Sequence, residues 1–425
     1  RDDDPLGGHG GPVVRTPITS QRRKGWTMSL FAAVEATPND PIFGLTDKFN
    51  RDTDPHKVNL GVGMYQDDDG RVPLLESVRI AEERLARAAK PATYPPMDGL
   101  PDYNADAQRV VFGADSEAVA SGRVVTGQSL GGTGGLTLAA DVYGSVSPNH
   151  KALVSTPTWA NHIAIMRHAG YDVGKYAYYD GRTGVDIDGL LSDLSGAEPG
   201  TMVIMHECCH NPTGYDLTRS QWDAVTEAVR QRGLMLLIDM AYQGFSQGLD
   251  EDAETIRRLA AAGLTFMVSS SFSKNFSLYG ERVGAVHFVC ADADEAARVR
   301  TRVKTAARED YSTPPLHGAQ VVRTVLQDEQ LRDTWTDEVS TMRERIKKMR
   351  TGLVDGLRAA GVTDMDFIND QAGMFSYSGL DKAQMEELRA VHHVYGTDAG
   401  RICVAALNSR NIDHVVAAIA AVRGQ

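Results

Sequence analysis

Strand-like and helix-like patterns alternate along the middle of this 425-residue chain, from about residue 123 to residue 290. Helical patterns such as Gln221–Arg232 and Ala253–Ala262 lie between short apolar, partly β-branched runs. The runs predict these strands: Arg123–Thr126, Ala152–Ser155, Lys175–Tyr179, Met202–His206, Met235–Asp239, Phe266–Ser270 and Gly284–Val289. Strands that alternate with helices favour an α/β fold, in which helices cover both faces of a mostly parallel sheet.

A smaller α+β unit is expected towards the C-terminus. A long charged helical pattern from Asp328 to Leu357 leads into it. The patterns that follow predict strand Gly373–Ser378, helix Lys382–Val391, strand Ile402–Ala405 and helix Asp413–Val422.

The overall composition narrows the class of protein. A net charge of −12 offers no basic stripe for nucleic-acid phosphates, so we expect no nucleic-acid partner. No stretch approaches the roughly 18 uninterrupted apolar residues of a membrane span. Two of the four cysteines, Cys208 and Cys209, are adjacent and close no useful loop, which indicates reduced thiols in a cytoplasmic protein. Residues 1–27 show no apolar period, and we expect them to be a disordered extension.

Chemically active residue types follow the strands, at the edge where an open parallel sheet binds its ligands. They are Gly131–Gly135 after the first strand, Trp159 after the second, His210–Gly214 after the fourth, Asp239 and Tyr242 after the fifth, and Lys274 after the sixth. Glycine amides at a helix start suit a phosphate, and a tryptophan ring suits stacking on a planar ligand. The ordinary alternatives are a tight turn for the glycines and core packing for the tryptophan. Together the residues predict one ligand site.

Lys274 is the most informative of these residues. It lies among serines within Ser269–Gly284, and Arg282 follows eight residues later. Burying an unpaired ammonium is unfavourable, so such lysines shift towards the neutral amine, which can bond covalently to an aldehyde cofactor. The serines and the arginine suit that cofactor's phosphate. Asp239 ends a buried strand and needs a cationic partner, such as a protonated pyridine nitrogen. The alternative for Lys274 is a solvated side chain on a polar loop.

The run His206–His210 contains His, Glu and Cys, which are the residue types of a metal site. Neighbouring residues on an extended segment point to opposite sides and do not readily converge on one ion. We therefore expect no metal site.

Several motifs are specific enough to indicate a family. They are His210–Gly214, Asp239–Phe245, Ser271–Asn275 with Arg282–Gly284, Tyr311–Pro315 and Gly373–Ser376. With them the chain resembles the fold-type I pyridoxal-phosphate aminotransferases, in the subgroup of aspartate and aromatic amino-acid aminotransferases. The resemblance covers about Phe31 to Val422. It implies an N-terminal arm (28–39), a large cofactor-binding domain (74–341) and a small domain built from 40–73 and 342–425.

The resemblance implies that the cofactor is pyridoxal 5'-phosphate. Lys274 would hold it covalently and move protons during catalysis, and Asp239 would pair with its pyridine nitrogen. Tyr242 and Asn211 would hydrogen-bond the ring's phenolic oxygen, and Trp159 would stack on the ring. The phosphate would be bound by Gly132, Thr133, Ser271, Ser273 and Arg282.

The resemblance also implies how substrates and subunits meet. Arg401, helped by the backbone at Gly63, would clamp the α-carboxylate of the substrate. In the neighbouring subunit's site, Tyr94 would touch the cofactor phosphate and Arg308 the distal carboxylate of a dicarboxylic substrate. Sites that share residues between subunits imply a homodimer.

The choice of amino donor follows from smaller similarities. Tyr94–Leu100 and Phe375–Leu380 resemble the aromatic branch more than the aspartate branch, and the pocket positions Met64 and Gln66 are uncharged. The expected reaction moves the amino group of tyrosine, phenylalanine or tryptophan, and also of aspartate, to 2-oxoglutarate, giving the 2-oxo acid and glutamate. The alternatives are a strict aspartate aminotransferase and, more remotely, a non-catalytic regulatory domain that binds the cofactor.

Two positions depart from the family's usual pattern. Glu207 stands where a small residue or proline is common, and Asp398 lies shortly before Arg401. We expect a carboxylate at 398 to weaken or orient that arginine, which affects substrate affinity and leaves the reaction class unchanged.

Overall fold

The computed structural model describes residues 29–36, 41–181 and 184–424. The predicted disordered extension, residues 1–27, lies outside the described residues. In the N-terminal stretch, the 3-10 helix η1 (Leu30–Ala33) begins after Ser29, whose hydroxyl accepts a hydrogen bond from the amide of Phe31. Residues from Pro41 onward form one compact unit, to which the rest of the fold belongs. The division of that unit into a large and a small domain stays a prediction.

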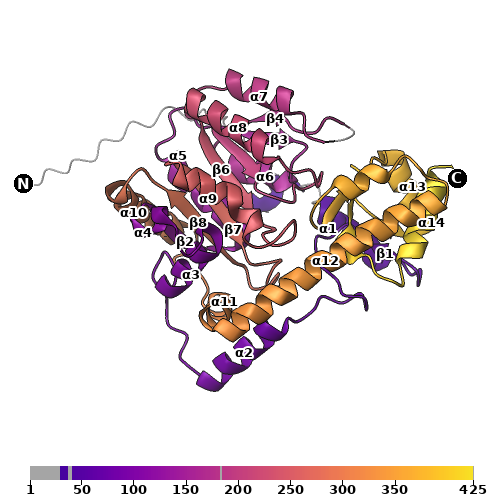
Figure 1. The fold of residues 1–425 in the computed structure, drawn as a ribbon, viewed down its shortest axis with the longest axis horizontal. Helices are drawn as coiled ribbons and strands as arrows, with labels where there is room; N and C mark the ends of the chain where they lie inside the picture. The colour runs from indigo at the N-terminus through magenta and orange to yellow at the C-terminus, as the bar shows by residue number, and fades with distance from the viewer. Residues whose placement is uncertain (1–28, 37–40, 182–183, 425) are drawn as a thin grey trace, which may run out of the picture. The chain divides into compact units, whose positions relative to one another are not determined.

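The central sheet has seven strands in the order β2, β8, β7, β6, β5, β3, β4 (Figure 1). They are β2 (Val124–Leu130), β3 (Lys151–Thr156), β4 (Asp172–Ala177), β5 (Met202–His206), β6 (Met235–Met240), β7 (Phe266–Ser271) and β8 (Val283–Val289). Within this sheet β8 alone runs antiparallel to its neighbours, and it follows β7 without the helical crossover that a parallel strand needs. The predicted α/β fold with a mostly parallel sheet is confirmed, and β4 begins and ends earlier than predicted.

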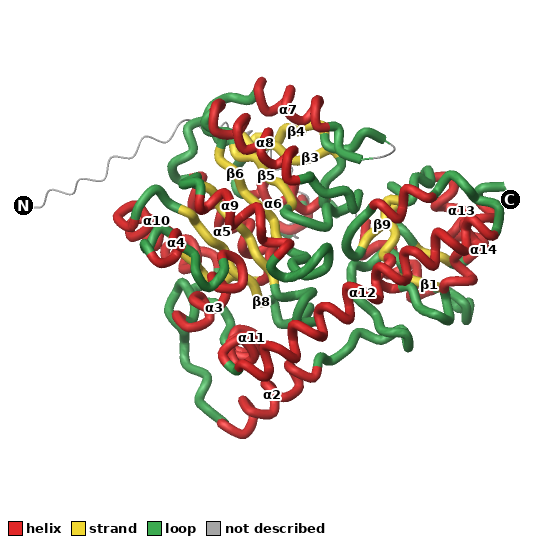
Figure 2. The backbone as a smooth tube through the Cα atoms, viewed as in Figure 1, coloured by secondary structure: helices red, strands yellow, loops and turns green. Residues whose placement is uncertain are grey.

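Helices cover both faces of this sheet (Figure 2). Side chains alternate along a strand, so Leu236 and Ile238 of β6 enter one apolar cluster and Leu237 enters the other. The Leu237 face is covered by α5 (Gly131–Gly144), α6 (Ala160–His168) and α10 (Ala293–Asp310). The opposite face is covered by α3 (Pro101–Phe112), α4 (Glu117–Ala120), α7 (Ile187–Gly196), α8 (Arg219–Arg232) and α9 (Glu254–Ala261).

The long helix predicted from Asp328 is α12 (Glu329–Ala359), with 31 residues. Asp328 caps it by accepting a hydrogen bond from the amide of Leu331 (3.0 Å). Its buried residues recur every three or four positions and form one apolar stripe: Leu331, Trp335, Val339, Met342, Ile346, Met349, Leu353 and Leu357. The helices α2 (Glu76–Ala88), α11 (His317–Gln327) and α14 (Ile412–Val422) pack against α12. Among the described helices, none combines the length and the apolarity that a membrane crossing requires.

Two small sheets lie in the C-terminal part of the fold. Strand β1 (Val58–Asn59) pairs in parallel with β10 (Val394–Tyr395), and β9 (Phe375–Tyr377) pairs antiparallel with β11 (Arg401–Cys403). The remaining elements are α1 (Pro41–Arg51), η2 (Glu251–Ala253), η3 (Asp366–Asp370), α13 (Lys382–His392) and η4 (Val404–Ala406). The predicted strand Ile402–Ala405 is therefore wrong at its end. Val404 and Ala405 turn into η4, and because both are fully buried, their apolar side chains carry no periodicity that separates a strand from a turn.

The start of β8 lies close to the start of α5, and Gly284 allows this approach. A Cβ atom on Gly284 would lie 2.6 Å from the carbonyl carbon of Gly131 and 2.7 Å from the carbonyl oxygen of Ser270. Both atoms belong to the backbone and cannot rotate away.

We expect Gly284→Ala to lower the thermal unfolding midpoint, because overpacking a filled interior costs about 1–3 kcal/mol. Gly280→Ala is the matched control, since a Cβ atom there meets no atom within 4 Å. Circular dichroism melts of both variants and the parent protein measure the effect. Equal midpoints for the two variants would contradict this account.

Candidate active site

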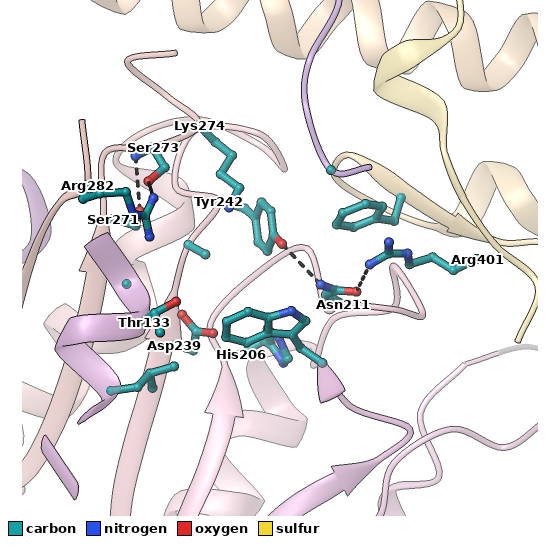
Figure 3. Close-up of a pocket in the computed structure, with 16 residues that line it drawn as sticks. Thr133, His206, Asn211, Asp239, Tyr242, Ser271, Ser273, Lys274, Arg282 and Arg401 are labelled. Atoms are coloured by element: carbon teal, nitrogen blue, oxygen red, sulfur yellow. Dashed lines mark hydrogen bonds between the residues drawn. The ribbon is translucent and has the colours of Figure 1, made fainter. Parts of the chain in front are cut away.

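A cavity of about 220 Å³ lies beyond the carboxyl ends of β5, β6 and β7 (Figure 3). Most of the residues predicted from the sequence line it: Gly63, Gly132, Thr133, Trp159, Asn211, Asp239, Tyr242, Ser271, Ser273, Lys274, Arg282 and Arg401. Leu136, His206, Ala241 and Phe375 also line it, and the sequence analysis gave them no role. The structure thus brings into one cavity residues that the chain separates by more than 300 positions.

The register of the sheet aligns the residues at the cavity floor. His206 of β5 pairs with Asp239 of β6, and Asp239 pairs with Ser269 of β7. Because side chains alternate between faces, these three residues point to the face that α5 and α6 cover. Glu207 points to the other face, where the amides of Thr255 and Ile256 at the start of α9 lie near it, and burial raises its pKa to about 8. This departure from the family's pattern does not line the cavity.

Asp239 has one oxygen engaged and one oxygen free. Its Oδ2 lies 2.9 Å from His162 Nε2, and Thr158 Oγ1 lies 2.9 Å from the other ring nitrogen of that histidine. Its Oδ1 is buried and has no hydrogen-bond partner among the described residues. Burial alone would raise the pKa of Asp239, but the hydrogen bond and charge of His162 outweigh it and hold the pKa below its usual value. An ionised carboxylate with a free oxygen suits a cationic N–H group.

His162 was not singled out in the sequence analysis. A lone histidine on a helix resembles any half-buried histidine, and its partner Asp239 lies 77 positions away.

His206 lies beside His162, with ring centroids 5.0 Å apart, and burial lowers the pKa of His206 to about 3. Ligand atoms of His162, His206 and Asp239 lie within 4.8 Å of one another, so this is the group of described residues that could hold a metal ion. The expectation of no metal site stays a prediction.

Lys274 follows the end of β7 and is buried in the cavity wall. Burial, against the opposing charge of Asp239, and the charges of Arg282 and Arg401 together lower the pKa of its amine to about 8. Its Nζ lies 5.3 Å from the centre of the Tyr242 ring. At pH 7 a pKa of about 8 leaves about a tenth of this amine neutral and therefore nucleophilic, far more than for an ordinary lysine.

The start of α5 forms a site for an anion. Helix α5 begins at Gly131, so the amides of Gly132 and Thr133 are not used by the helix and can bind a ligand. Arg282 lies next to them: a Cβ atom on Gly131 would be 2.7 Å from its Nη2. Arg282 Nη1 donates to Ser273 Oγ (3.4 Å) and to the carbonyl of Tyr279 (2.9 Å). Free helix amides, hydroxyls and a guanidinium at one point are the groups that bind a phosphate.

Arg401 lies at the opposite side of the cavity, on β11. Its Nη1 donates to Asn211 Oδ1 (3.1 Å) and its Nη2 to the carbonyl of Gly61 (2.6 Å). Asn211 in turn donates to the hydroxyl of Tyr242 (3.4 Å). The guanidinium makes no ion pair with any described carboxylate, and its Nε has no partner. It is therefore available to an anionic ligand.

Asp398 does not affect Arg401 in the way expected from the sequence. Its Oδ1 accepts a hydrogen bond from Arg389 Nη2 at 2.6 Å, and the carboxylate is engaged there. The expectation that Asp398 weakens or orients Arg401 is wrong, because Asp398 forms its ion pair with Arg389 of α13 instead.

Tyr94 and Arg308 do not line the cavity. Tyr94 is 91% exposed, and Arg308, in the last turn of α10, is exposed and donates to the hydroxyl of Ser312. The prediction that both serve a neighbouring subunit stays a prediction. Trp159 lies at the cavity wall just before α6, with its ring edge-on to His162.

Known proteins resemble this chain over most of its length. The sequence model of the family described as aminotransferase class I and II matches residues 55–419. An aspartate aminotransferase from Pseudomonas aeruginosa is 48% identical over 394 residues, which cover 92% of this chain and 99% of the relative. An aromatic-amino-acid aminotransferase from Escherichia coli is 46% identical over 396 residues, which cover 92% of this chain and all of the relative.

Solved structures agree with the sequence comparison. The crystal structure of an aromatic-amino-acid aminotransferase from Burkholderia pseudomallei, covalently bound to pyridoxal phosphate, superposes with a TM-score of 0.91. It is 52% identical and covers 93% of this chain and 100% of its own. The resemblance inferred from the motifs is confirmed, and the chain belongs to the class I and II aminotransferase family.

Proposed function

We propose that this pyridoxal-phosphate-dependent aminotransferase moves the amino group of aromatic amino acids, and of aspartate, to 2-oxoglutarate. The observation that carries this proposal is the arrangement of charges in the cavity: Lys274 shares it with the carboxylate of Asp239 and the guanidinium of Arg401, which has no ion pair among the described residues. A regulatory domain that only bound the cofactor would use the lysine as well, but it would not need a guanidinium available to a substrate carboxylate.

The residues fit pyridoxal phosphate. The free Oδ1 of Asp239 suits the protonated pyridine nitrogen, and the start of α5 with Arg282 suits the phosphate. Tyr242 and Asn211, which lie within hydrogen-bonding distance of each other in the cavity, would hydrogen-bond the phenolic oxygen, and Trp159 would stack on the ring. When bound, the cofactor supplies an electron sink for the carbon that loses its proton.

Each residue then has a defined task. Lys274 Nζ holds the cofactor covalently and, when released, moves the proton at the α-carbon of the substrate. Arg401 binds the α-carboxylate with two parallel N–H groups, next to the backbone at Gly63. The hydrogen bond with His162 keeps Asp239 ionised, and the ionised carboxylate would keep the pyridine nitrogen of the cofactor protonated.

The uncharged walls of the cavity support aromatic donors. Trp159, Tyr242 and Phe375 present rings to it. Its two arginines are already assigned, Arg401 to the α-carboxylate of the substrate and Arg282 to the phosphate of the cofactor. The second candidate is a strict aspartate aminotransferase, which the 48% identity to a relative of that name favours.

We also propose a homodimer and a cytoplasmic location. The exposed positions of Tyr94 and Arg308 are what residues that complete a neighbouring subunit's site require. Tyr94 lies on an apolar hollow lined by Leu85, Ala89, Pro314, Pro315 and Leu316, which suits burial against a second copy. The four cysteines are buried free thiols, as a reducing compartment maintains them.

The donor is tested by steady-state kinetics with 2-oxoglutarate as acceptor and glutamate formation as readout. We expect kcat/KM for tyrosine to equal or exceed that for aspartate, because Trp159, Tyr242 and Phe375 offer aromatic contacts to the side chain of the donor. Fast turnover of aspartate with negligible turnover of tyrosine would establish the strict aspartate enzyme instead. Lys274→Ala, which removes the amine that moves the proton, sets the background.

Arg308→Ala tests the role of the exposed arginine. Aspartate and 2-oxoglutarate should lose kcat/KM by roughly 30- to 1,000-fold, which corresponds to about 2–4 kcal/mol for a lost charge-assisted pair. Phenylalanine should lose far less, because it has no distal carboxylate. Arg302→Ala, on the exposed side of the same helix, is the matched control. Equal losses for aspartate and phenylalanine would refute the assignment.

The pKa of Lys274 predicts how cofactor-free protein captures pyridoxal phosphate. Only the neutral amine reacts, so the rate of covalent capture should rise with pH and level off above a midpoint near the pKa of about 8. An ordinary lysine would give a rise that continues to about pH 10.4. Absorbance of the bound cofactor measures the rate, and Lys274→Ala corrects for titration of the cofactor itself. A rate that keeps rising beyond pH 10 would contradict the lowered pKa.

A further inference from the structure

Arg350, in the middle of α12, is a buried arginine outside the cavity. It is 3% exposed, and burial lowers the pKa of its guanidinium to about 10. It makes no ion pair with any described carboxylate. Its hydrogen bonds go to one segment, the 373–376 loop, which leads into β9 and includes the first two residues of that strand. Nη2 donates to the carbonyls of Gly373 and Phe375 (3.2 Å to the latter), and Nε donates to Ser376 Oγ (3.3 Å). Burying a cation with carbonyls and a hydroxyl as partners, and without an ion pair, is unfavourable, which indicates that Arg350 has a role in this segment.

The loop held by Arg350 presents Phe375 to the substrate clamp. The ring of Phe375 lies 4.3 Å from the guanidinium carbon of Arg401, in a cation–π contact. A Cβ atom on Gly63 would lie 2.6 Å from Cζ, at the tip of the same ring. The ring therefore lies against both Gly63 and Arg401, so a shift of the 373–376 backbone would change the surroundings of the guanidinium.

The same loop interlocks with the segment that carries Asn211. The amide of Ala372 donates to the carbonyl of Gly214 (2.7 Å), and a Cβ atom on Gly373 would lie 2.3 Å from Cys209 Cβ. Asp216 holds that segment by accepting hydrogen bonds from the amides of Cys209 (2.8 Å) and His210 (2.9 Å). The segment and the loop are therefore in direct contact, and Asn211 is the side chain that accepts a hydrogen bond from Arg401 Nη1.

We propose that Arg350 is a positioning residue for recognition of the substrate carboxylate. It fixes the 373–376 loop, so that Phe375 and Asn211 hold the guanidinium of Arg401 in the plane that two parallel hydrogen bonds to a carboxylate require. The inference rests on the proposed role of Arg401 as the clamp. Arg350 touches neither the cavity nor the elements that carry Lys274 and Asp239, so the groups assigned to the cofactor's phosphate and pyridine nitrogen are independent of it.

This independence makes the effect selective. A misaligned clamp weakens binding of the carboxylate in the ground state and in the transition state alike, which raises KM more than it lowers kcat. Displacements of about 1 Å far from the chemistry can cost on the order of a hundredfold in rate. General loosening of the fold would affect uncharged ligands and the cofactor as well.

The experiment uses the cofactor-loaded enzyme and two probes, 3-phenylpropionate and its uncharged counterpart 3-phenylpropan-1-ol. In Arg350→Met, the Kd of the carboxylate and the KM of tyrosine should rise at least about tenfold. The Kd of the alcohol should stay as in the parent. Arg350→Lys keeps the charge and part of the hydrogen bonding, so it should lose less. If Arg350→Met does not fold, the comparison of Arg350→Lys with the parent protein tests the proposal.

The matched control is Arg345→Lys on the same helix. Arg345 is mostly buried and also donates to a backbone carbonyl, that of Leu407, but it does not touch the 373–376 loop. An unchanged Kd for the carboxylate in the Arg350 variants would overturn the proposal, as would equal losses for the acid and the alcohol or the same loss in Arg345→Lys. Arg401→Lys separates this outcome from failure of the proposed function. If it weakens carboxylate binding while the Arg350 variants do not, only the positioning role is refuted.

Discussion

The burial of Lys274 between one carboxylate and two arginines is the constraint on which the site depends. A lysine in this position is neither fully charged nor fully neutral, because burial and the two guanidinium groups lower its pKa while Asp239 raises it. Asp239 can supply that opposing charge only as long as it stays ionised in a buried position. The hydrogen bond from His162 provides this, and it fixes Oδ2 so that Oδ1 remains available.

The fold meets this demand through the register of three neighbouring strands. His206, Asp239 and Ser269 are aligned across β5, β6 and β7, and their common parity sends them to one face of the sheet. A slip of one residue in β6 would send Asp239 towards the opposite apolar cluster and Ile238 or Met240 into the cavity. The apolar residues that alternate with Asp239, on both faces, make such a slip unfavourable. The same register of β6 therefore both packs the core and places the catalytic carboxylate in the cavity.

Much of this could be predicted from the sequence, because strand patterns and polar residues at strand ends are local signals. Lys274, Asp239 and Asn211 each follow an apolar run, and the rule for open parallel sheets places such residues together. The supporting residues could not be found in this way. His162 and Phe375 act through partners far away in the chain, and Arg350 resembles any arginine on an amphipathic helix until the loop at 373–376 folds against it. The two-residue strands β1 and β10 carry too few residues for a period to be visible.

The cavity of a single chain leaves donor choice only partly determined. Arg401 and the start of α5 account for an α-carboxylate and a phosphate, and the remaining walls are mainly rings and uncharged groups. A pocket of this kind accepts a neutral or aromatic side chain on shape and apolar contact, which discriminates weakly among ligands of similar size. Strong preference for a second carboxylate requires a second cation. In the described part of the chain, Arg308 is exposed and away from the cavity, so under the proposed dimer that cation comes from the neighbouring subunit. Acidic and aromatic donors would then be distinguished by how that arginine moves, while both use the same clamp at Arg401.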